Sequence, residues 1–503
     1  MTTMENSRTK PGSDQASSGW GALLRGRNGV LCLALAGGVM LHAINVYVTI
    51  TILPSVVEDI GGAAYYAWNT TLFILASIVG SAVSSNILAR LGPRTGYRLA
   101  ILVFLSGAAI CAVAPNMPVL LTGRAIQGLG GGILFALSYA MIRIVFDEHL
   151  WPRAMAIVSS MWGAATLAGP ALGGVFAEFD MWRGAFWGLL IVGAPYLLLT
   201  ERILPKKDAK RTDMTAVAWL QICFLTLTVM LISVGSLSSA LAINLVGLAA
   251  AAILIAALIF MERRRTLRLL PRGSFDPGGS LSILYAVMAL LVIGMQTEIF
   301  VPYFLQAMHD LSPLVAGYLA ALMAAGWAIS AILFSGLNGP GARRAVMLGP
   351  MIVTLALLAL VVVLPAVSPA DDIGLFMIAA GLTAVGFGIG LAWPHLLARV
   401  LVVAPKDEED KASSGITTLQ LFATALGAAL AGLVANANGF DGSGTVAGAK
   451  DAAFWLFASF ALAPAMATIL SILVARDMKM AKNSPQTNES RRLRSESNPT
   501  ARP

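Results

Sequence analysis

Long apolar stretches alternate with short polar segments from about residue 30 to about residue 475. A transmembrane helix needs about 20 predominantly apolar residues. The pattern therefore predicts fourteen membrane-spanning helices, near residues 30–54, 66–89, 98–115, 118–145, 154–177, 183–201, 215–236, 240–261, 280–307, 313–336, 346–366, 373–397, 413–436 and 452–475. The expected fold class is an all-α polytopic membrane protein.

Composition agrees with this prediction. Of 503 residues, 57% are hydrophobic and 12% are charged, whereas roughly 25% are charged in soluble domains. We find no removable signal peptide in the first 28 residues, so the first apolar stretch is expected to remain as a helix. The three cysteines lie within apolar stretches, where they are expected to be small packing residues. We expect no disulfide, no metal site and no cofactor.

The distribution of positive charge predicts the orientation in the membrane. If the path alternates, both tails lie on one side, and most arginines and lysines of the connecting loops share that side; among them are Arg25, Arg27, Arg98, Lys206, Lys207, Lys210, Arg211, Arg263 to Arg265, Arg268, Arg343 and Arg344. Positively charged loops stay in the cytoplasm, so both termini are predicted to be cytoplasmic. The net charge of +8 therefore reflects membrane orientation, and we do not expect nucleic acid as a partner.

The fifth span contains a small-residue face beside a proline. Small residues recur every fourth position from 165 to 177, so on a helix they allow a neighbouring helix to approach closely. Pro170 predicts a bend beside this face. The segment Gly169, Pro170, Ala171, Leu172, Gly173 and Gly174 resembles the antiporter signature of the major facilitator superfamily. The alternative is that glycine and proline are simply common in membrane helices.

The chain also resembles a duplicated unit. A Gly-Pro turn followed by arginine comes after span 2 and again after span 10, and spans 5 and 13 share the small-residue pattern. Six spans, two inserted spans and six further spans resemble the fourteen-span drug:proton antiporters of the superfamily. The expected regions are a cytoplasmic tail (1–28), an N-terminal bundle (29–202), a linker with two extra helices (203–278), a C-terminal bundle (279–478) and a disordered cytoplasmic tail (479–503).

The loop after span 2 resembles the gate motif of the superfamily. Arg90, Gly92 and Arg94 match this motif, whereas Ala89 stands where the family has aspartate. In the family, that carboxylate pairs with an arginine to latch the outward-facing state. The resemblance therefore implies a conformational role for these residues but leaves open what replaces the latch.

Span 4 carries a charged residue inside an apolar stretch. Arg124 and Gln127 lie three residues apart and resemble the family's Arg-x-x-Gln-Gly helix. A charge within a span normally faces the protein interior and has a partner there. We expect Arg124 to take part in proton coupling and Gln127 to contact substrate. The alternative is that Arg124 extends to the outer interface.

Glu298 in span 9 is the most informative acid. It lies inside the apolar stretch that begins near residue 280, with Gln296, Tyr303 and Gln306 as polar neighbours. Burial disfavours the charged form of a carboxyl, which suits Glu298 to take up and release a proton. The three neighbours are candidates for substrate binding. The alternative is a structural glutamate that is protonated or paired with arginine.

Span 1 places His42, Asn45 and Thr49 on one helical face. The family has an aspartate at the position that Asn45 occupies here, and asparagine cannot titrate. Glu298 therefore carries the proton alone or is assisted by His42, unless His42 is only a packing residue. Asn45 and Thr49 are candidates for substrate contact.

Trp327 and Gln420 are further candidates for substrate contact, although aromatic residues on membrane helices often face lipid. We interpret the chain as a proton-coupled exporter of amphipathic small molecules or drugs in the bacterial inner membrane, working as a monomer. Its partners are then a small-molecule substrate, protons and the lipid bilayer. Alternatives are export of an endogenous metabolite, siderophore or lipid, and proton-coupled uptake. No HExxH, GxSxG or paired-acid motif points to an enzyme.

Overall fold

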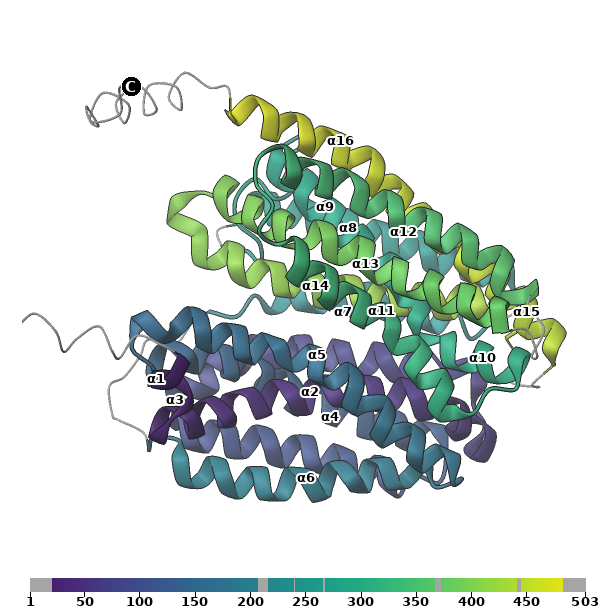
Figure 1. Ribbon diagram of the computed structural model, residues 1–503, viewed down its shortest axis with the longest axis horizontal. Coiled ribbons are helices and arrows are strands. Elements are labelled where there is room, and N and C mark those ends of the chain that lie inside the picture. Colours follow the sequence, from purple (N-terminus) through teal and green to yellow (C-terminus); the bar gives the residue numbers. More distant parts are fainter. Residues whose placement is uncertain are drawn as a thin grey trace, which may run out of the picture.

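The computed structural model describes residues 20–206, 216–238, 240–265, 267–366, 372–440 and 445–482. Lys207, Lys210 and Arg211, most of the predicted N-terminal tail and the predicted disordered tail from residue 483 onward lie outside the described residues. Helices that run back and forth make up the described part of the chain (Figure 1).

Twelve helical segments among the described residues are long and apolar enough to cross a membrane. One of them contains α3, which has 45 residues and holds predicted spans 2 and 3 on either side of a kink. The kink lies at Gly92, whose φ of 75° is a backbone conformation that glycine adopts without steric cost. Another apolar helix, α7, has 17 residues. These helices fit the predicted fourteen spans.

The N-terminal half is built on very close contacts between helices. Its elements are α1 (Trp20–Leu24), α2 (Gly26–Ile60), η2 (Ala63–Tyr65), α3 (Trp68–Ala112), α4 (Met117–Val145), η3 (Glu148–Leu150), α5 (Trp151–Glu178) and α6 (Trp182–Ile203). Gly128 and Gly132 of α4 lie directly against the backbone of Phe73 and Ser77 in α3. The Ser77 hydroxyl donates a hydrogen bond of 3.0 Å to the Gly128 carbonyl. Small residues thus allow α3 and α4 to pack backbone against backbone.

The C-terminal half forms a second bundle, above the first in Figure 1. Its elements are α9 (Ser280–Met295), η4 (Gln296–Ile299), α10 (Val301–His309), α11 (Pro313–Phe334), α12 (Pro340–Ala366), α13 (Asp372–Val403), η5 (Lys406–Glu408), α14 (Glu409–Ala437), α15 (Val446–Phe460) and α16 (Leu462–Lys482). Predicted spans 9 and 14 are each divided between helices. Pro464 accounts for the break in span 14, because its ring clashes with the carbonyl of Phe460 four residues earlier.

The inserted pair, α7 (Trp219–Gly235) and α8 (Leu241–Arg264), is attached to the C-terminal half. The buried Glu262 carboxylate accepts hydrogen bonds from the backbone N–H groups of Leu269 and Leu270. Arg272 then pairs with Asp407 and Glu408 beside α14. The segment after α8 is therefore held in place by side chains on both sides.

The two halves meet through α5 with α11 and through α3 with α14. We call the end with α1 and the end of α16 the tail end, and the end with η2 and the start of α15 the far end (Figure 1). Three hydrogen bonds between described residues join the halves toward the far end: Asn436 to the Ala64 carbonyl, Tyr318 to the Leu167 carbonyl, and the Leu314 N–H to Glu178. Contact at the far end thus holds this conformation together.

Candidate transport site

Glu298 lies where span 9 breaks. The sequence predicts one helix from 280 to 307, but the structure has α9, the 3₁₀ turn η4 and α10. Pro302 explains the difference, because a proline ring clashes with the carbonyl four residues earlier, which belongs to Glu298. Glu298 is 8% exposed, and its Oε1 has no hydrogen-bond partner among the described residues. The acid is therefore buried at an interruption of the helix.

The polar neighbours of Glu298 differ in their contacts. Gln296 donates a hydrogen bond of 2.9 Å to the Val292 carbonyl one turn earlier, so its amide nitrogen is engaged within its own span. Tyr303 and Gln306 are half-buried, and no described residue forms a hydrogen bond with the Gln306 amide nitrogen. The interrupted helix thus leaves two buried polar atoms available to a ligand, namely Glu298 Oε1 and the Gln306 amide nitrogen.

Arg124 faces the interior of the N-terminal half. Its side chain is 1% exposed, and it donates hydrogen bonds to Gln127 Oε1 at 2.7 Å and to the Asn69 carbonyl at 3.3 Å. The guanidinium carbon lies 4.4 Å from the centre of the Phe73 ring, within range of a cation–π interaction. The outer interface, which the sequence left as an alternative, is not where this side chain lies.

Arg124 and Glu298 are not paired with each other. Neither forms an ion pair within the described part of the chain, and the partners of Arg124 all belong to the N-terminal half. The contact of Phe73 with Arg124 could not be predicted from the sequence. In an apolar helix, an aromatic residue that binds a cation has the same sequence pattern as one that only packs.

His42 is enclosed by aromatic rings. The centres of the Phe73, Phe135 and Trp162 rings lie 5.1, 5.3 and 5.9 Å from that of His42. His42 is 1% exposed, and within the described part of the chain neither ring nitrogen meets the geometry of a hydrogen bond. Gly131 permits this fit, because a Cβ there would lie 2.9 Å from His42 Nδ1. The structure thus brings both His42 and Arg124 against the Phe73 ring.

Asn45 and Thr49 share the buried face of α2 with His42, as predicted from their spacing. Thr49 donates a hydrogen bond of 2.9 Å to the Asn45 carbonyl, so its hydroxyl is engaged within the helix. Asn45 is fully buried, and neither its side-chain nitrogen nor its side-chain oxygen has a hydrogen-bond partner in the residues that the structure describes. A buried amide without partners is costly unless another group completes its hydrogen bonds.

The two remaining candidates for substrate contact lie on the C-terminal half. Trp327 of α11 is half-buried and packs edge-to-face on Trp393 of α13, with 5.0 Å between ring centres. Gln420 is half-buried on α14. Among the described residues, the ring contacts of His42 are with Phe73, Phe135 and Trp162 and include neither candidate, so the two halves present separate sets of candidates.

The small-residue face of α5 packs on α2 and on α11. A Cβ at Gly169 would lie 2.3 Å from Tyr47 Cβ, one at Gly173 2.9 Å from the Val48 carbonyl oxygen, and one at Gly174 2.7 Å from Leu314 Cα. Pro170 lies within α5 between these contacts. Leu314 belongs to the other half, so this face also takes part in the junction between halves.

The loop after span 2 stays within the N-terminal half. Gly92 forms the turn, and the Arg94 guanidinium donates two hydrogen bonds, of 2.9 and 2.7 Å, to the Leu204 carbonyl at the end of α6. Arg90 is exposed in the same loop. Arg94 therefore fastens the loop to α6.

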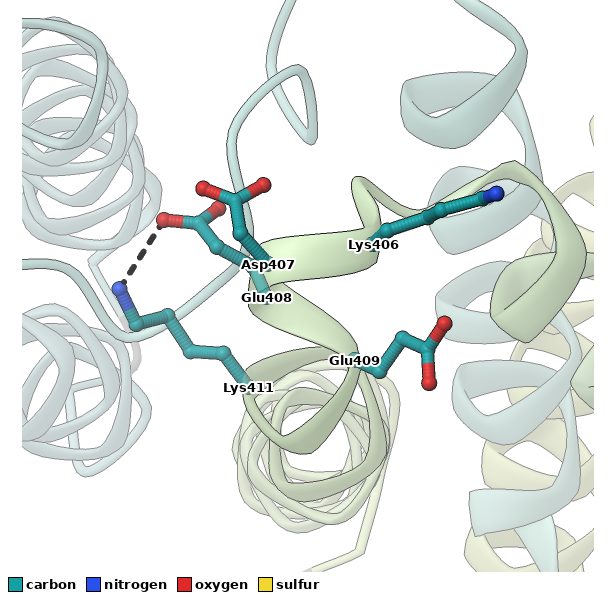
Figure 2. Close-up of a pocket in the computed structure, with 5 residues that line it drawn as sticks. All are labelled: Lys406, Asp407, Glu408, Glu409 and Lys411. Atoms are coloured by element: carbon teal, nitrogen blue, oxygen red, sulfur yellow. Dashed lines mark hydrogen bonds and ion pairs between the residues drawn. The ribbon is translucent and has the colours of Figure 1, made fainter.

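A shallow hollow of about 390 Å³ lies elsewhere, around η5 and the start of α14 (Figure 2). Its lining residues are charged and of both signs, namely Lys406, Asp407, Glu408, Glu409 and Lys411. Figure 2 shows Glu408 and Lys411 joined across it. This hollow is at the tail end and does not include Glu298, so we do not assign transport to it.

Comparisons with known proteins place these features in context. Residues 35–340 match the model of the Major Facilitator Superfamily. A Mycobacterium tuberculosis (strain H37Rv) protein named probable multidrug-efflux transporter is 36% identical over 80% of this chain and 87% of its own length. The tetracenomycin C resistance and export protein of Streptomyces glaucescens is 29% identical over 67% of this chain and 63% of its own.

Solved structures show the same fold. A bacterial homologue of the human lysosomal transporter Spinster, in an inward-facing and unoccupied conformation, matches with a TM-score of 0.62 at 15% identity, over 91% of this chain and 99% of its own. The POT family transporter PepTSo gives a TM-score of 0.62 at 17% identity, over 90% of this chain and 98% of its own. These likenesses confirm the fold class that the sequence predicted.

Proposed function

Because the chain belongs to the Major Facilitator Superfamily, we propose that it exports amphipathic small molecules, drugs among them, in exchange for protons. It is a membrane protein that transports small molecules. The relative named as a probable multidrug-efflux transporter supports efflux of drugs. The proposed coupling of this efflux to proton uptake depends on Glu298.

The observation that carries the proposal is the position of Glu298. The carboxyl is buried at a helix break, has an unpartnered oxygen and has no ion pair within the described residues. An ionisable residue inside a membrane bundle marks a pathway for ions or substrate more often than a structural feature. A proton can bind there without displacing an existing partner.

The proposed cycle is alternating access between two bundles, residues 29–202 and 279–478, about a central site. The tail end faces the cytoplasm, because loops rich in arginine and lysine stay on the cytoplasmic side of the inner membrane. In this conformation the halves meet toward the far end. A proton arriving from outside at Glu298 favours one state, and its loss to the cytoplasm after cargo release resets the transporter.

The buried polar groups of the N-terminal half complete the proposed site. Arg124 is held by Gln127, so it offers a fixed positive charge, and His42 and Asn45 offer unpartnered polar atoms. We propose that His42 assists proton movement and that Asn45 contacts cargo. By linkage, proton and cargo change each other's affinity by the same factor.

Export of a compound that the cell itself makes is the second candidate. The relative named for tetracenomycin C resistance and export supports it. The transport machinery would be the same for both kinds of cargo.

The test is Glu298→Gln in purified protein reconstituted into vesicles. We expect proton release on addition of a transported amphiphile, and pH-driven export, to be lost, because glutamine cannot exchange a proton. Glu58→Gln is the matched control, since Glu58 is an exposed acid on α2. Unchanged proton exchange in Glu298→Gln would contradict the proposal.

A further inference from the structure

Four aromatic rings form a cluster at the far end. Phe300 lies 4.9 Å from Tyr66 and 5.1 Å from Phe440 between ring centres, and Tyr66 lies 5.2 Å from Phe440. Tyr303 completes the cluster, 4.7 Å from Phe440 and 6.0 Å from Tyr66. Tyr66, Phe300 and Phe440 are at most 3% exposed. We call these four residues the aromatic cluster.

The aromatic cluster spans the boundary between the halves. Tyr66 comes from the N-terminal half, just before α3, whereas the other three rings come from the C-terminal half. Asn436 reinforces the same boundary, because its amide donates hydrogen bonds of 2.9 Å to the Ala64 carbonyl and 3.0 Å to the Ser236 carbonyl of the inserted pair. Separation of the halves at the far end must therefore withdraw Tyr66 from the other three rings.

The aromatic cluster lies next to the buried acid. Phe300 follows Glu298 by two residues and caps the turn η4 that contains it. The rings are stacked or edge-to-face, which are the arrangements that aromatic pairs favour, and they leave Phe300 fully buried. Well-packed aromatic rings of this kind leave no room for a chain of water molecules.

We propose that the aromatic cluster is the far-end gate, which separates Glu298 from the far side of the membrane in this conformation, and that Tyr66 is its moving part. The inference rests on the proposed function, because a gate matters only if Glu298 exchanges protons. Its closure prevents protons from crossing when the tail end is open. Its opening admits them to Glu298.

The first experiment measures proton leak in vesicles that contain the purified full-length protein and no cargo. We expect Tyr66→Ala and Phe440→Ala to leak at least fivefold faster than the unchanged protein, and Tyr66→Phe to remain tight because it keeps the ring. Tyr65→Ala is the matched control, because Tyr65 contacts Trp68 within the same half. Leak at the control rate in both alanine variants would overturn the gate.

The double variant Tyr66→Ala with Glu298→Gln separates the two proposals. If Glu298 lies on the proton path, the leak caused by Tyr66→Ala should disappear in the double variant. A leak that persists would uphold the cluster as a seal but remove Glu298 from proton coupling.

A cross-link covers the case in which the alanine variants do not fold. Ala64→Cys with Asn436→Cys, joined by a short reducible thiol reagent in a Cys223→Ser background, ties the far end closed. We expect transport to stop and to return on reduction. Transport that continues in the cross-linked protein would overturn the gate.

Discussion

Replacing Gly132 with alanine tests how closely α3 and α4 pack. A Cβ at this position would lie 2.2 Å from the Ser77 carbonyl oxygen and 2.5 Å from Ser77 Cα. Both atoms belong to the backbone of α3, so rotation of a side chain cannot relieve the contact. The helix α4 must move away by roughly 1 Å to reach ordinary van der Waals separation.

The expected magnitude follows from two opposing effects. Overpacking a close contact costs about 1–3 kcal/mol, whereas alanine favours a helix over glycine by about 1 kcal/mol. We therefore expect the free energy of unfolding to fall by up to about 2 kcal/mol in Gly132→Ala. Gly163 of α5 is the matched control, because a Cβ there would meet nothing within 4 Å. Gly163→Ala should gain up to about 1 kcal/mol.

The assay is unfolding of the purified protein in mixed micelles by increasing dodecyl sulfate, followed by tryptophan fluorescence. Both variants are compared with the unchanged protein in the same detergent. The reasoning is refuted if Gly132→Ala is as stable as Gly163→Ala, because the close approach of α3 and α4 would then have no energetic consequence.

Two further predictions use the same purified protein. Tyr196→Phe removes a buried hydroxyl that donates a hydrogen bond of 2.6 Å to the Ala34 carbonyl, and the dodecyl sulfate titration should show a loss of about 1 kcal/mol; equal stability would mean that the hydrogen bond contributes nothing. Glu408→Gln tests a pH dependence. Burial raises the pKa of the Glu408 carboxyl, but hydrogen bonds from the Arg272 N–H and Lys411, with their charges, outweigh burial and hold this pKa below its usual value. A lowered pKa gives stability that is present above the pKa of the unfolded chain and lost as the pH falls through the folded value. The melting temperature of the unchanged protein should therefore exceed that of Glu408→Gln at pH 7, and the difference should shrink below about pH 4; a difference that grows on acidification would contradict this.

Most of the helices could be predicted, because the length of an apolar stretch is enough to identify a membrane span. The turn at Gly92 could also be predicted, since a Gly-Pro pair followed by arginine indicates a loop between apolar stretches. The breaks at Glu298 and Phe460 were missed, because the apolar pattern continues through both. A proline lies four residues after each break, but this signal alone would not have found them, because Pro170 and Pro195 lie inside helices that continue.

The candidate site was predictable only in part. The burial of Arg124 and His42 follows from polar residues in apolar spans, but their neighbours belong to other spans and cannot be derived from spacing within one helix. The aromatic cluster could not be predicted for the same reason, since most of the chain separates Tyr66 from Phe440. Side chains that meet only after the two halves assemble leave no local pattern.

The break beside Glu298 determines how span 9 can bend. A proline fixes the location of a pivot, because the lost backbone hydrogen bond belongs to one particular turn, while the angle between α9 and α10 stays adjustable. A group at a pivot is displaced little but reoriented strongly when the arms move. In the proposed cycle, Glu298 therefore turns from one compartment toward the other without travelling across the bilayer.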